Sequence, residues 1–230
     1  MNAREEILAR IAAAHRAAPP SNQSYEDIAR EYRTTSDAPA TELTELLTDR
    51  LVDYRALVRQ CSVDDLGATI GNALAERGAN TVVAPTGLDS SWTASFSGSV
   101  LTDGLSADDQ LGVPDLDGVD GVISGCAVAI AETGTLILDG SPGQGRRVLT
   151  LIPDYHLCVV LTDQIVPDVP QALARLDATR PLTMISGPSA TSDIELNRVE
   201  GVHGPRTLEV VIVVVSAEPF ARLRSHERSS

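Results

Sequence analysis

Apolar residues recur every three or four positions along the first third of the chain, which is the spacing that buries one face of an α-helix. This spacing predicts a helix over residues 2–17 and a second helix over residues 41–60. A third helix is predicted to begin after Ser62 and to end at Gly78, because glycine commonly closes a helix in the left-handed conformation. The N-terminal part of the chain is therefore expected to be helical.

The apolar residues further along the chain come in short continuous runs. Such a run is typical of a strand that is covered on both faces. The runs occupy residues 81–85, 119–138, 157–161, 182–186 and 208–215. A further helix is predicted over residues 167–178. Helices that alternate with buried strands predict an α/β fold.

Polar segments divide the chain into three parts. Residues 18–40 are rich in turn-forming residues, which predicts an extended arm or linker. We therefore expect an N-terminal helix and arm over residues 1–40, an α/β domain over residues 41–217 and a charged C-terminal tail over residues 218–230.

The charge of the chain excludes several classes of function. With 32 acidic and 18 basic residues the net charge is −14, whereas a protein that binds a duplex needs a basic surface, so we expect no nucleic-acid partner. All the basic residues are arginine, which excludes Schiff-base and P-loop-lysine chemistry. No apolar run reaches the roughly eighteen residues of a membrane span, and the N-terminus does not resemble a secretory signal. We expect a cytoplasmic protein without membrane insertion.

Cys61, Cys126 and Cys158 lie far apart in the sequence and form no C-x-x-C pair. An iron–sulfur cluster usually needs four thiolates in close groups, and structural zinc needs similar pairs. We therefore expect this chain to bind no metal and no cofactor of its own. The thiols are expected to be small buried residues in a reducing compartment.

Glu132 interrupts an apolar run and is followed by Thr133 and Gly134. A carboxylate inside a buried strand must be paired, hydrogen-bonded or protonated, because burying an isolated charge is costly. Glu132 is therefore a candidate catalytic acid or nucleophile. In the alternative interpretation Glu132 ends a strand at the surface and Gly134 forms a bulge. Both interpretations stay open at this point.

A glycine-rich segment, residues 140–145 (GSPGQG), precedes Arg146 and Arg147. It matches neither the dinucleotide fingerprint nor a P-loop, so a flexible connection is the simpler interpretation of its glycines. Arg146 and Arg147 are the stronger candidates for contacting an anionic ligand, because they lead into the strand that carries His156.

We expect the functional surface to centre on the polar stretch from Gly187 to Pro205, where a predicted strand runs into a glycine turn. Ser192 and Glu195 have the spacing of a capping box, which predicts a helix start at Ser189–Ser192. Backbone N–H groups at such a start would suit a carboxylate or phosphate. Plain N-capping is the alternative interpretation. The candidate ligand-binding residues of this stretch are Gly187, Ser189, Thr191, Ser192, Asp193, Glu195 and Gly204.

Two histidines are candidates for proton transfer. His203 stands between glycines just before the last buried strand, from which it could face the predicted helix start, so it is our first candidate for a general acid or base. His156 lies just ahead of another buried strand and is the second candidate.

Four segments occur in the order seen in the LUD-domain family, and the chain resembles that family over roughly residues 119–215. Within the family the resemblance is greatest to lactate-utilization proteins of the C type. GPSATSDIE followed by GVHGP is a specific combination, whereas the likeness upstream is looser. The four segments are AIAETGTLIL from Ala129, the stretch with Arg147, Pro153 and His156, GPSATSDIE from Gly187, and GVHGP from Gly201.

The resemblance implies a fold similar to the sugar-phosphate isomerase and CoA-transferase group, an open, parallel-rich α/β sheet flanked by helices. It also implies a role in oxidising L-lactate to pyruvate, together with two partner proteins that carry iron–sulfur clusters. It does not settle the role of any matched residue. The matched positions are Glu132, Thr133, Gly134, Arg147, His156, Gly187, Ser189, Thr191, Asp193, Glu195, His203 and Gly204.

Three functions follow as hypotheses. The first is a non-redox subunit that holds a small carboxylate or assembles the iron–sulfur partners. The second is an enzyme with acyl- or CoA-transferase-like or isomerase-like chemistry that uses Glu132 and His203. The third is a module that binds a small anion, such as a carboxylate or phosphate, without turnover. A homo-oligomer is compatible with each of them.

Overall fold

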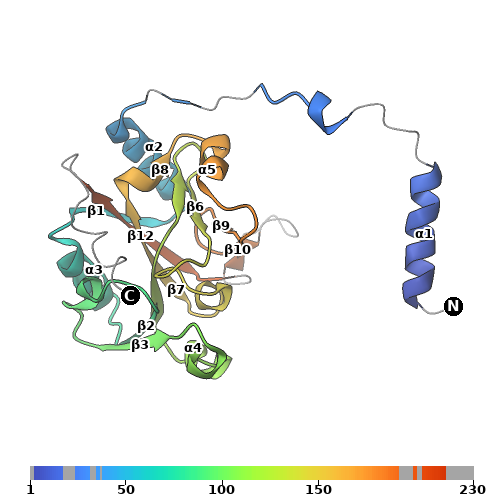
Figure 1. Ribbon diagram of the computed structural model, residues 1–230. Coiled ribbons are helices and arrows are strands. Elements are labelled where there is room, and N and C mark those ends of the chain that lie inside the picture. Colours follow the sequence, from blue (N-terminus) through green and yellow to red (C-terminus); the bar gives the residue numbers. More distant parts are fainter. Residues whose placement is uncertain are drawn as a thin grey trace, which may run out of the picture. The chain divides into compact units, whose positions relative to one another are not determined.

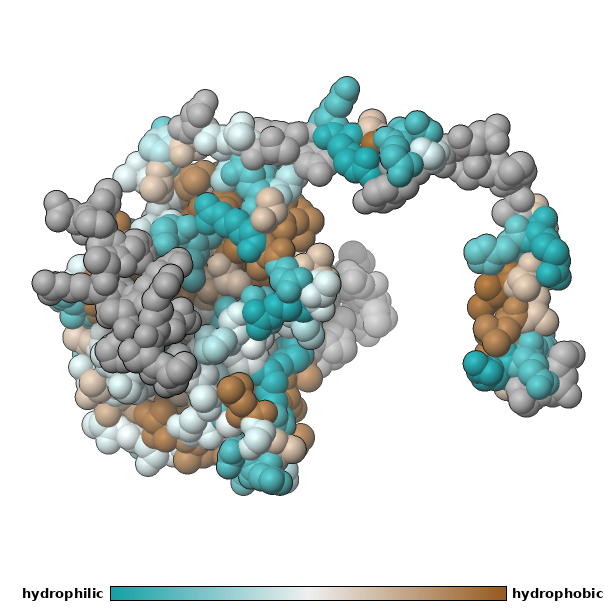
Figure 2. Space-filling view, viewed as in Figure 1, coloured by the Kyte–Doolittle hydropathy of each residue, from teal (hydrophilic) through white to brown (hydrophobic). Residues whose placement is uncertain are grey.

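The computed structural model describes residues 3–17, 24–31, 35–36, 38–191, 199–200 and 204–215. The chain divides into two units, Met1–Arg33 and Thr34–Ser230 (Figure 1). The first contains helix α1 (Ala3–Ala17) and the single 3₁₀ turn η1 (Tyr25–Asp27). Apolar side chains are exposed on α1 itself (Figure 2). The helix predicted over residues 2–17 is confirmed.

Six parallel strands form the central sheet of the second unit, in the order β1-β12-β7-β4-β2-β3. The middle strands are buried on both faces, as their continuous apolar sequences predict. This arrangement confirms the parallel-rich α/β fold. The strands are β1 (Leu57–Ser62), β2 (Thr81–Pro85), β3 (Ser99–Asp103), β4 (Gly121–Gly125), β7 (Tyr155–Leu161) and β12 (Thr207–Val214).

A second sheet of four strands, in the order β8-β5-β6-β9, packs against the central one. Its strands β5 and β6 form an antiparallel hairpin. The predicted apolar run over residues 119–138 is therefore three strands that belong to two sheets. The strands of the second sheet are β5 (Val128–Ile130), β6 (Thr135–Leu138), β8 (Ile165–Val166) and β9 (Thr183–Ile185).

Different elements cover the two faces of the central sheet, as Figure 1 shows. Helix α3 (Leu66–Glu76) packs on one face, against Leu157 and Val211. Helix α2 (Ala40–Asp53) and the second sheet cover the opposite face. Helix α5 (Val169–Arg175) lies on the outer side of the second sheet. None of the helices in the described part of the chain is long and apolar enough to span a membrane.

Most of the predicted elements are confirmed. Helix α3 is followed by Gly78 at a positive φ of 67°, as its predicted end requires. The strands predicted at residues 81–85, 157–161, 182–186 and 208–215 are present, and the helix predicted over residues 167–178 is the shorter α5. The remaining short elements are η2 (Ser90–Thr93), η3 (Ala107–Asp109), α4 (Val113–Asp117), η4 (Arg147–Thr150), η5 (Thr162–Gln164), β10 (Ala190–Thr191) and β11 (Val199–Glu200).

The helix predicted over residues 41–60 is wrong beyond Asp53. Arg55 has a positive φ of 67°, which interrupts the helical repeat. Leu57–Ser62 then forms β1 and pairs in parallel with β12 along its whole length. Pairing with a buried strand outweighs the helical spacing of the apolar residues in this segment, because propensity is a weak determinant beside tertiary contacts.

The helix start predicted at Ser189–Ser192 is also wrong where the structure describes it. Ala190 and Thr191 form β10, which pairs in antiparallel fashion with β11. An extended hairpin strand does not present the free N–H groups of a helix terminus, so it cannot bind an anion in the predicted way. The predicted residues that lie outside the described part of the chain are Ser192, Asp193, Glu195 and His203.

Candidate functional site

A small cavity of about 190 Å³ lies where β7 and β12 begin, and we call it the His156 pocket. It brings together five of the residues that the sequence predicts, from three separate stretches of the chain. Its lining includes Arg147, Thr150, His156, Ser186, Gly187, Ser189 and Gly204.

Backbone geometry explains how two of these stretches meet. The Ser189 N–H donates a hydrogen bond of 2.9 Å to the carbonyl of Pro205. Gly187 has a φ of 85°, and a Cβ added to it would lie 2.6 Å from the Cβ of Tyr54. Only glycine fits such a close approach at a positive φ. The predicted glycine turn is thus required for the wall of the pocket to form.

His156 is held from the neighbouring strand. Its side chain is 1% exposed, and its Nε2 lies 2.7 Å from the Oγ of Ser124 on β4, within hydrogen-bond distance. A buried polar group needs such a partner, because an unsatisfied donor or acceptor costs about 1–3 kcal/mol. The imidazole is therefore fixed in orientation where it lines the pocket.

Two thiols lie behind His156 between the sheets. The neighbouring Cys158, together with burial, raises the pKa of the Cys126 thiol, which donates a hydrogen bond of 3.6 Å to Gln164 Oε1. The proximity of Cys126 and His156 lowers the pKa of Cys158. Both cysteines are buried, as the sequence predicts, whereas Cys61 is only partly buried. The described residues contain no group of three or more His, Cys, Asp or Glu side chains that could hold a metal ion.

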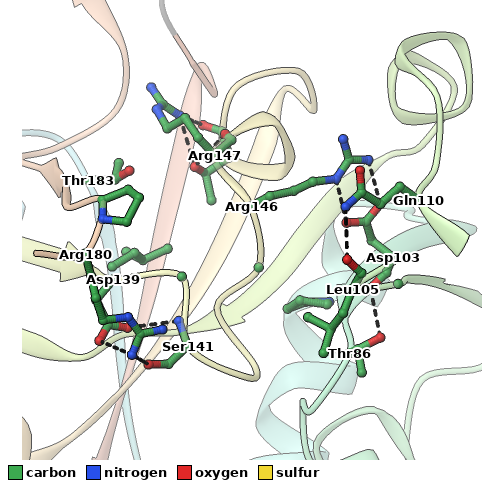
Figure 3. Close-up of a pocket in the computed structure, with 17 residues that line it drawn as sticks. Thr86, Asp103, Leu105, Gln110, Asp139, Ser141, Arg146, Arg147, Arg180 and Thr183 are labelled. Atoms are coloured by element: carbon green, nitrogen blue, oxygen red, sulfur yellow. Dashed lines mark hydrogen bonds and ion pairs between the residues drawn. The ribbon is translucent and has the colours of Figure 1, made fainter. Parts of the chain in front are cut away.

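Figure 3 shows a larger cavity of about 440 Å³. It adjoins the His156 pocket, because Arg147 and Thr150 line both. We call it the arginine cavity. The carboxyl ends of β2 and β3 form one wall, and the loop after β6 forms another. Arg180 and Pro181 before β9, and Thr183 at its start, complete it. The polar side chains that line it include Thr86, Asp103, Asp139, Ser141, Arg146, Arg147, Arg180 and Thr183.

Arg146 and Arg180 each bind a carboxylate of the protein itself. Arg146 donates two hydrogen bonds, of 2.8 and 2.7 Å, to Asp103. Burial raises the pKa of Asp103, but the hydrogen bonds from Arg146 and from the Leu111 N–H outweigh it, so the pKa is lowered. Arg180 lies 3.2 Å from Asp139 and donates to a nearby serine hydroxyl. In Figure 3 these two pairs lie on different sides of the cavity.

Arg147 differs from the other two arginines in position. Its guanidinium donates to the carbonyl and the hydroxyl of Thr150, at 2.9 and 3.0 Å. It lines both the His156 pocket and the arginine cavity. An anion in either cavity therefore meets the same cation.

Glu132 lies at the surface, as the alternative interpretation predicts, but Gly134 lies in the turn of the β5–β6 hairpin and not in a bulge. The Glu132 side chain is exposed on the turn between β5 and β6, and the Arg50 Nε–H donates to its carbonyl. Gly134 has a φ of 59°, and a Cβ added there would lie 2.7 Å from the Cβ of Arg50, so this glycine forms a tight turn. The carboxylate does not lie inside a buried strand, which removes the physical reason for the catalytic interpretation.

The same turn nevertheless reaches the His156 pocket through a chain of hydroxyls. The hydroxyls of Thr133 and Thr135 are hydrogen-bonded at 2.7 Å. The Thr135 hydroxyl is in turn 2.8 Å from that of Ser186, which lines the pocket. The predicted Thr133 thus supports the pocket indirectly.

Sequence reasoning missed several groups of the two cavities. Ser124 and Thr150 are single hydroxyl residues within apolar segments. A lone hydroxyl in such a segment could have indicated a buried hydrogen-bonding partner. Ser186 ends a predicted strand without a motif of its own. Thr191, which was predicted, lies in β10, where its backbone alone is described.

Comparison with known proteins places these observations in a family. A family model described as LUD domain matches residues 114–213. A lactate utilization protein C from Deinococcus radiodurans is 45% identical over 186 residues, which are 79% of this chain and 84% of that protein. A lactate utilization protein C from Halalkalibacterium halodurans is 28% identical over 194 residues, which are 76% of this chain and 80% of that protein.

A solved structure is also similar. The crystal structure of a DUF162 family protein from Deinococcus radiodurans superposes with a TM-score of 0.65 at 40% sequence identity. The match covers 76% of this chain and 99% of that one. The likeness therefore extends over about three quarters of this chain.

Proposed function

Because this chain belongs to the LUD-domain family, we propose that it is a subunit of an L-lactate-oxidising system and binds a small carboxylate beside Arg147. Its relatives that carry the name lactate utilization protein C support the pathway. In this proposal the chain binds no cofactor of its own, and iron–sulfur partner proteins accept the two electrons that leave lactate.

The position of Arg147 carries the proposal. Arginine binds carboxylates strongly because its planar fork of N–H donors matches the two oxygens. The His156 pocket, at about 190 Å³, is smaller than the roughly 300–1,000 Å³ typical of sites for drug-sized ligands, which favours an acid of a few carbons. With the carboxylate at Arg147, the lactate hydroxyl lies among His156, Ser186 and Ser189.

Calorimetry with lactate, pyruvate, phosphate and CoA tests the binding step. We expect lactate or pyruvate to bind the full chain and to bind Arg147→Met at least about tenfold more weakly, because a hydrogen bond to a charged group contributes about 1.5–3 kcal/mol. Arg10→Met is the matched control, since Arg10 pairs with Glu6 within helix α1. Undiminished affinity in Arg147→Met refutes the site. Equal binding of phosphate indicates a general anion-binding module instead.

The partnership needs a separate experiment in the native host. We expect deletion of the gene to abolish growth on lactate and the tagged full chain to co-purify with an iron-containing protein that mass spectrometry identifies. Growth that is unaffected by the deletion, together with purification of the chain without any iron–sulfur protein, contradicts the proposed system. Complementation with Arg147→Met then links the binding site to the pathway.

A further inference from the structure

A third cavity, of about 670 Å³, lies beyond the carboxyl ends of β2 and β4 and is separate from the Arg147 site. We call it the Trp92 cavity. The chain leads from β2 outward to β3 on one side and from β4 outward to β7 on the other, so the strand order reverses between β2 and β4. In open α/β sheets, ligands bind outside the carboxyl ends of the strands at such a reversal. Its lining includes Gly87, Asp89, Trp92, Gly125, Gly143 and Gln144.

The floor of this cavity is bare backbone held in a fixed position. The Gly143 N–H donates 3.0 Å to the carbonyl of Thr86, and the Gly125 N–H donates 2.9 Å to the carbonyl of Gly143. Gly87 and Gly143 have φ values of 88° and 79°, so glycine is needed at both. The glycine-rich loop, for which the sequence favoured a flexible connection, is therefore bound to the ends of two strands.

Gly125 is different, because nothing in the fold requires glycine there. Its φ is not positive, and an added Cβ would lie 3.8 Å from both the Gly143 carbonyl oxygen and the Cη2 of Trp92, which are ordinary contacts. The missing side chain keeps space open beside the indole ring. A methyl group at this position fills that space without straining the backbone.

Gln144 places an amide N–H donor at the wall of the cavity. The residue is 6% exposed, and its Oε1 accepts a hydrogen bond of 2.7 Å from the Asp139 N–H. Its Nε2 has no hydrogen bond in the described part of the chain. This Nε2 is open to the cavity rather than enclosed, so an acceptor on a ligand in the cavity can receive its N–H.

From these observations we infer that the Trp92 cavity binds a neutral planar heteroaromatic ring of the nucleobase class. The ring stacks on Trp92, and an acceptor on its edge receives the Nε2–H of Gln144. Base–aromatic stacking is tolerant of the exact ring, because every base has a π-face. Asp89 carries the only formal charge among the described lining residues, which disfavours a phosphate in the cavity and favours a nucleoside.

The single tryptophan of the chain makes the test direct, because its fluorescence can be excited alone. We expect adenosine, guanosine or uridine to quench Trp92 saturably, and ribose to have no effect. Gly125→Ala should weaken binding about tenfold or more, the size expected for losing one base–aromatic contact, without lowering the melting temperature. Trp92→Leu, followed by calorimetry, should lose binding as well.

Gly118→Ala is the matched control, because its Cβ would also make only ordinary contacts, 3.5 Å from the Pro114 carbonyl oxygen, and it lines no part of the cavity. Absence of saturable quenching by all three nucleosides at millimolar concentration overturns the inference, and so does equal affinity in wild type and Gly125→Ala. Arg147→Met should bind nucleosides normally, so failure of the carboxylate site and failure of this one are distinguishable.

Discussion

The two faces of strand β7 show how one strand serves stability on one side and ligand binding on the other. Tyr155 and Leu157 point to the face covered by α3, where they are fully buried. His156 and Cys158 point to the opposite face, where His156 lines a cavity. Neighbouring residues of one sequence therefore face environments with different requirements.

On the α3 face, polar groups are satisfied by one another. Glu209 is 1% exposed, pairs with Arg59 and accepts a hydrogen bond of 2.9 Å from the Tyr155 hydroxyl. Burial, together with the Glu209 carboxylate, raises the pKa of Tyr155. The guanidinium of Arg77 lies 4.2 Å from the centroid of the Tyr155 ring. This closed network leaves no group directed at a ligand.

On the opposite face, polar groups border open space. His156 has a partner in Ser124, but it also lines the pocket, as does Arg147. The contrast teaches that burial alone does not mark a functional residue in this fold. A buried polar group beside a cavity is the better indicator. We therefore expect variants on the α3 face to lose stability, and variants on the cavity face to lose ligand affinity as well.

The largest expected effect is on the α3 face. Glu209→Ala leaves Arg59 and the Tyr155 hydroxyl without their buried partner, and breaking a buried ion pair costs about 3–5 kcal/mol. Urea unfolding of the purified chain measures this loss. Glu76→Ala is the control, because Glu76 also pairs with Arg59 but is exposed, and such pairs contribute at most about 1 kcal/mol. Equal losses in the two variants would contradict the closed network.

A smaller effect is expected on the cavity face. Ser124→Ala removes the hydroxyl beside His156 Nε2, and an unsatisfied buried group costs about 1–3 kcal/mol. The same variant should weaken lactate binding, which Glu209→Ala should not do if the protein remains folded. Calorimetry and urea unfolding give both readouts, with exposed Ser99→Ala as control. Unchanged lactate affinity in Ser124→Ala would separate His156 from the site.

A pH-dependent effect is expected at the arginine cavity. The folded pKa of Asp103 lies below its unfolded value of about 3.9, so its carboxylate contributes stability above that pH. That stability is lost as the pH falls through the lowered folded pKa. In Arg146→Met, the hydrogen bonds that lower the pKa of Asp103 are missing, while burial still raises that pKa. The loss of stability should therefore begin at a higher pH. Unfolding free energies between about pH 2.5 and 5 measure the shift. Superimposable profiles would refute the role of Arg146.

The smallest effect is expected at Glu132. Its side chain is exposed on a turn, so Glu132→Gln should change the free energy of unfolding by no more than about 0.5 kcal/mol. Lactate affinity should also stay the same. Calorimetry decides the second point, and a clear loss of affinity would return Glu132 to the list of site residues.

Local signals explain which elements could be predicted from the sequence. Helix α3 ends at a glycine, and β2 follows as a short apolar run, so both were foreseen. The strand β1 was missed, because its residues also fit helical spacing. Pairing with β12, such as that of Arg59 with Glu209 at a separation of 150 residues, decides its conformation. No local pattern contains that information.

The residues of the candidate site also divide into those that the sequence predicts and those that it does not. Arg147, His156 and Ser189 stood out by residue type and by the family's segment order, and the structure brings them to one pocket. Ser124 and Trp92 did not stand out, because the residues beside which they act are distant in the sequence. Ser124 lies beside His156 and Trp92 beside Gly125 only in the folded protein. A serine in an apolar strand becomes a histidine's partner only after two strands pair.

The position of β12 has a consequence for how the protein is made. This strand is among the last described elements of the chain, yet it lies between β1 and β7, and β1 forms the sheet edge beyond it. During synthesis, β1 stays unpaired until its partner strand β12, Thr207–Val214, has left the ribosome. The ribosome adds about 5–20 residues per second, so β1 joins the sheet seconds after β2, β3, β4 and β7 can pair with one another. A chain that stops before Thr207 leaves β1 unpaired, exposing it to aggregation and proteolysis.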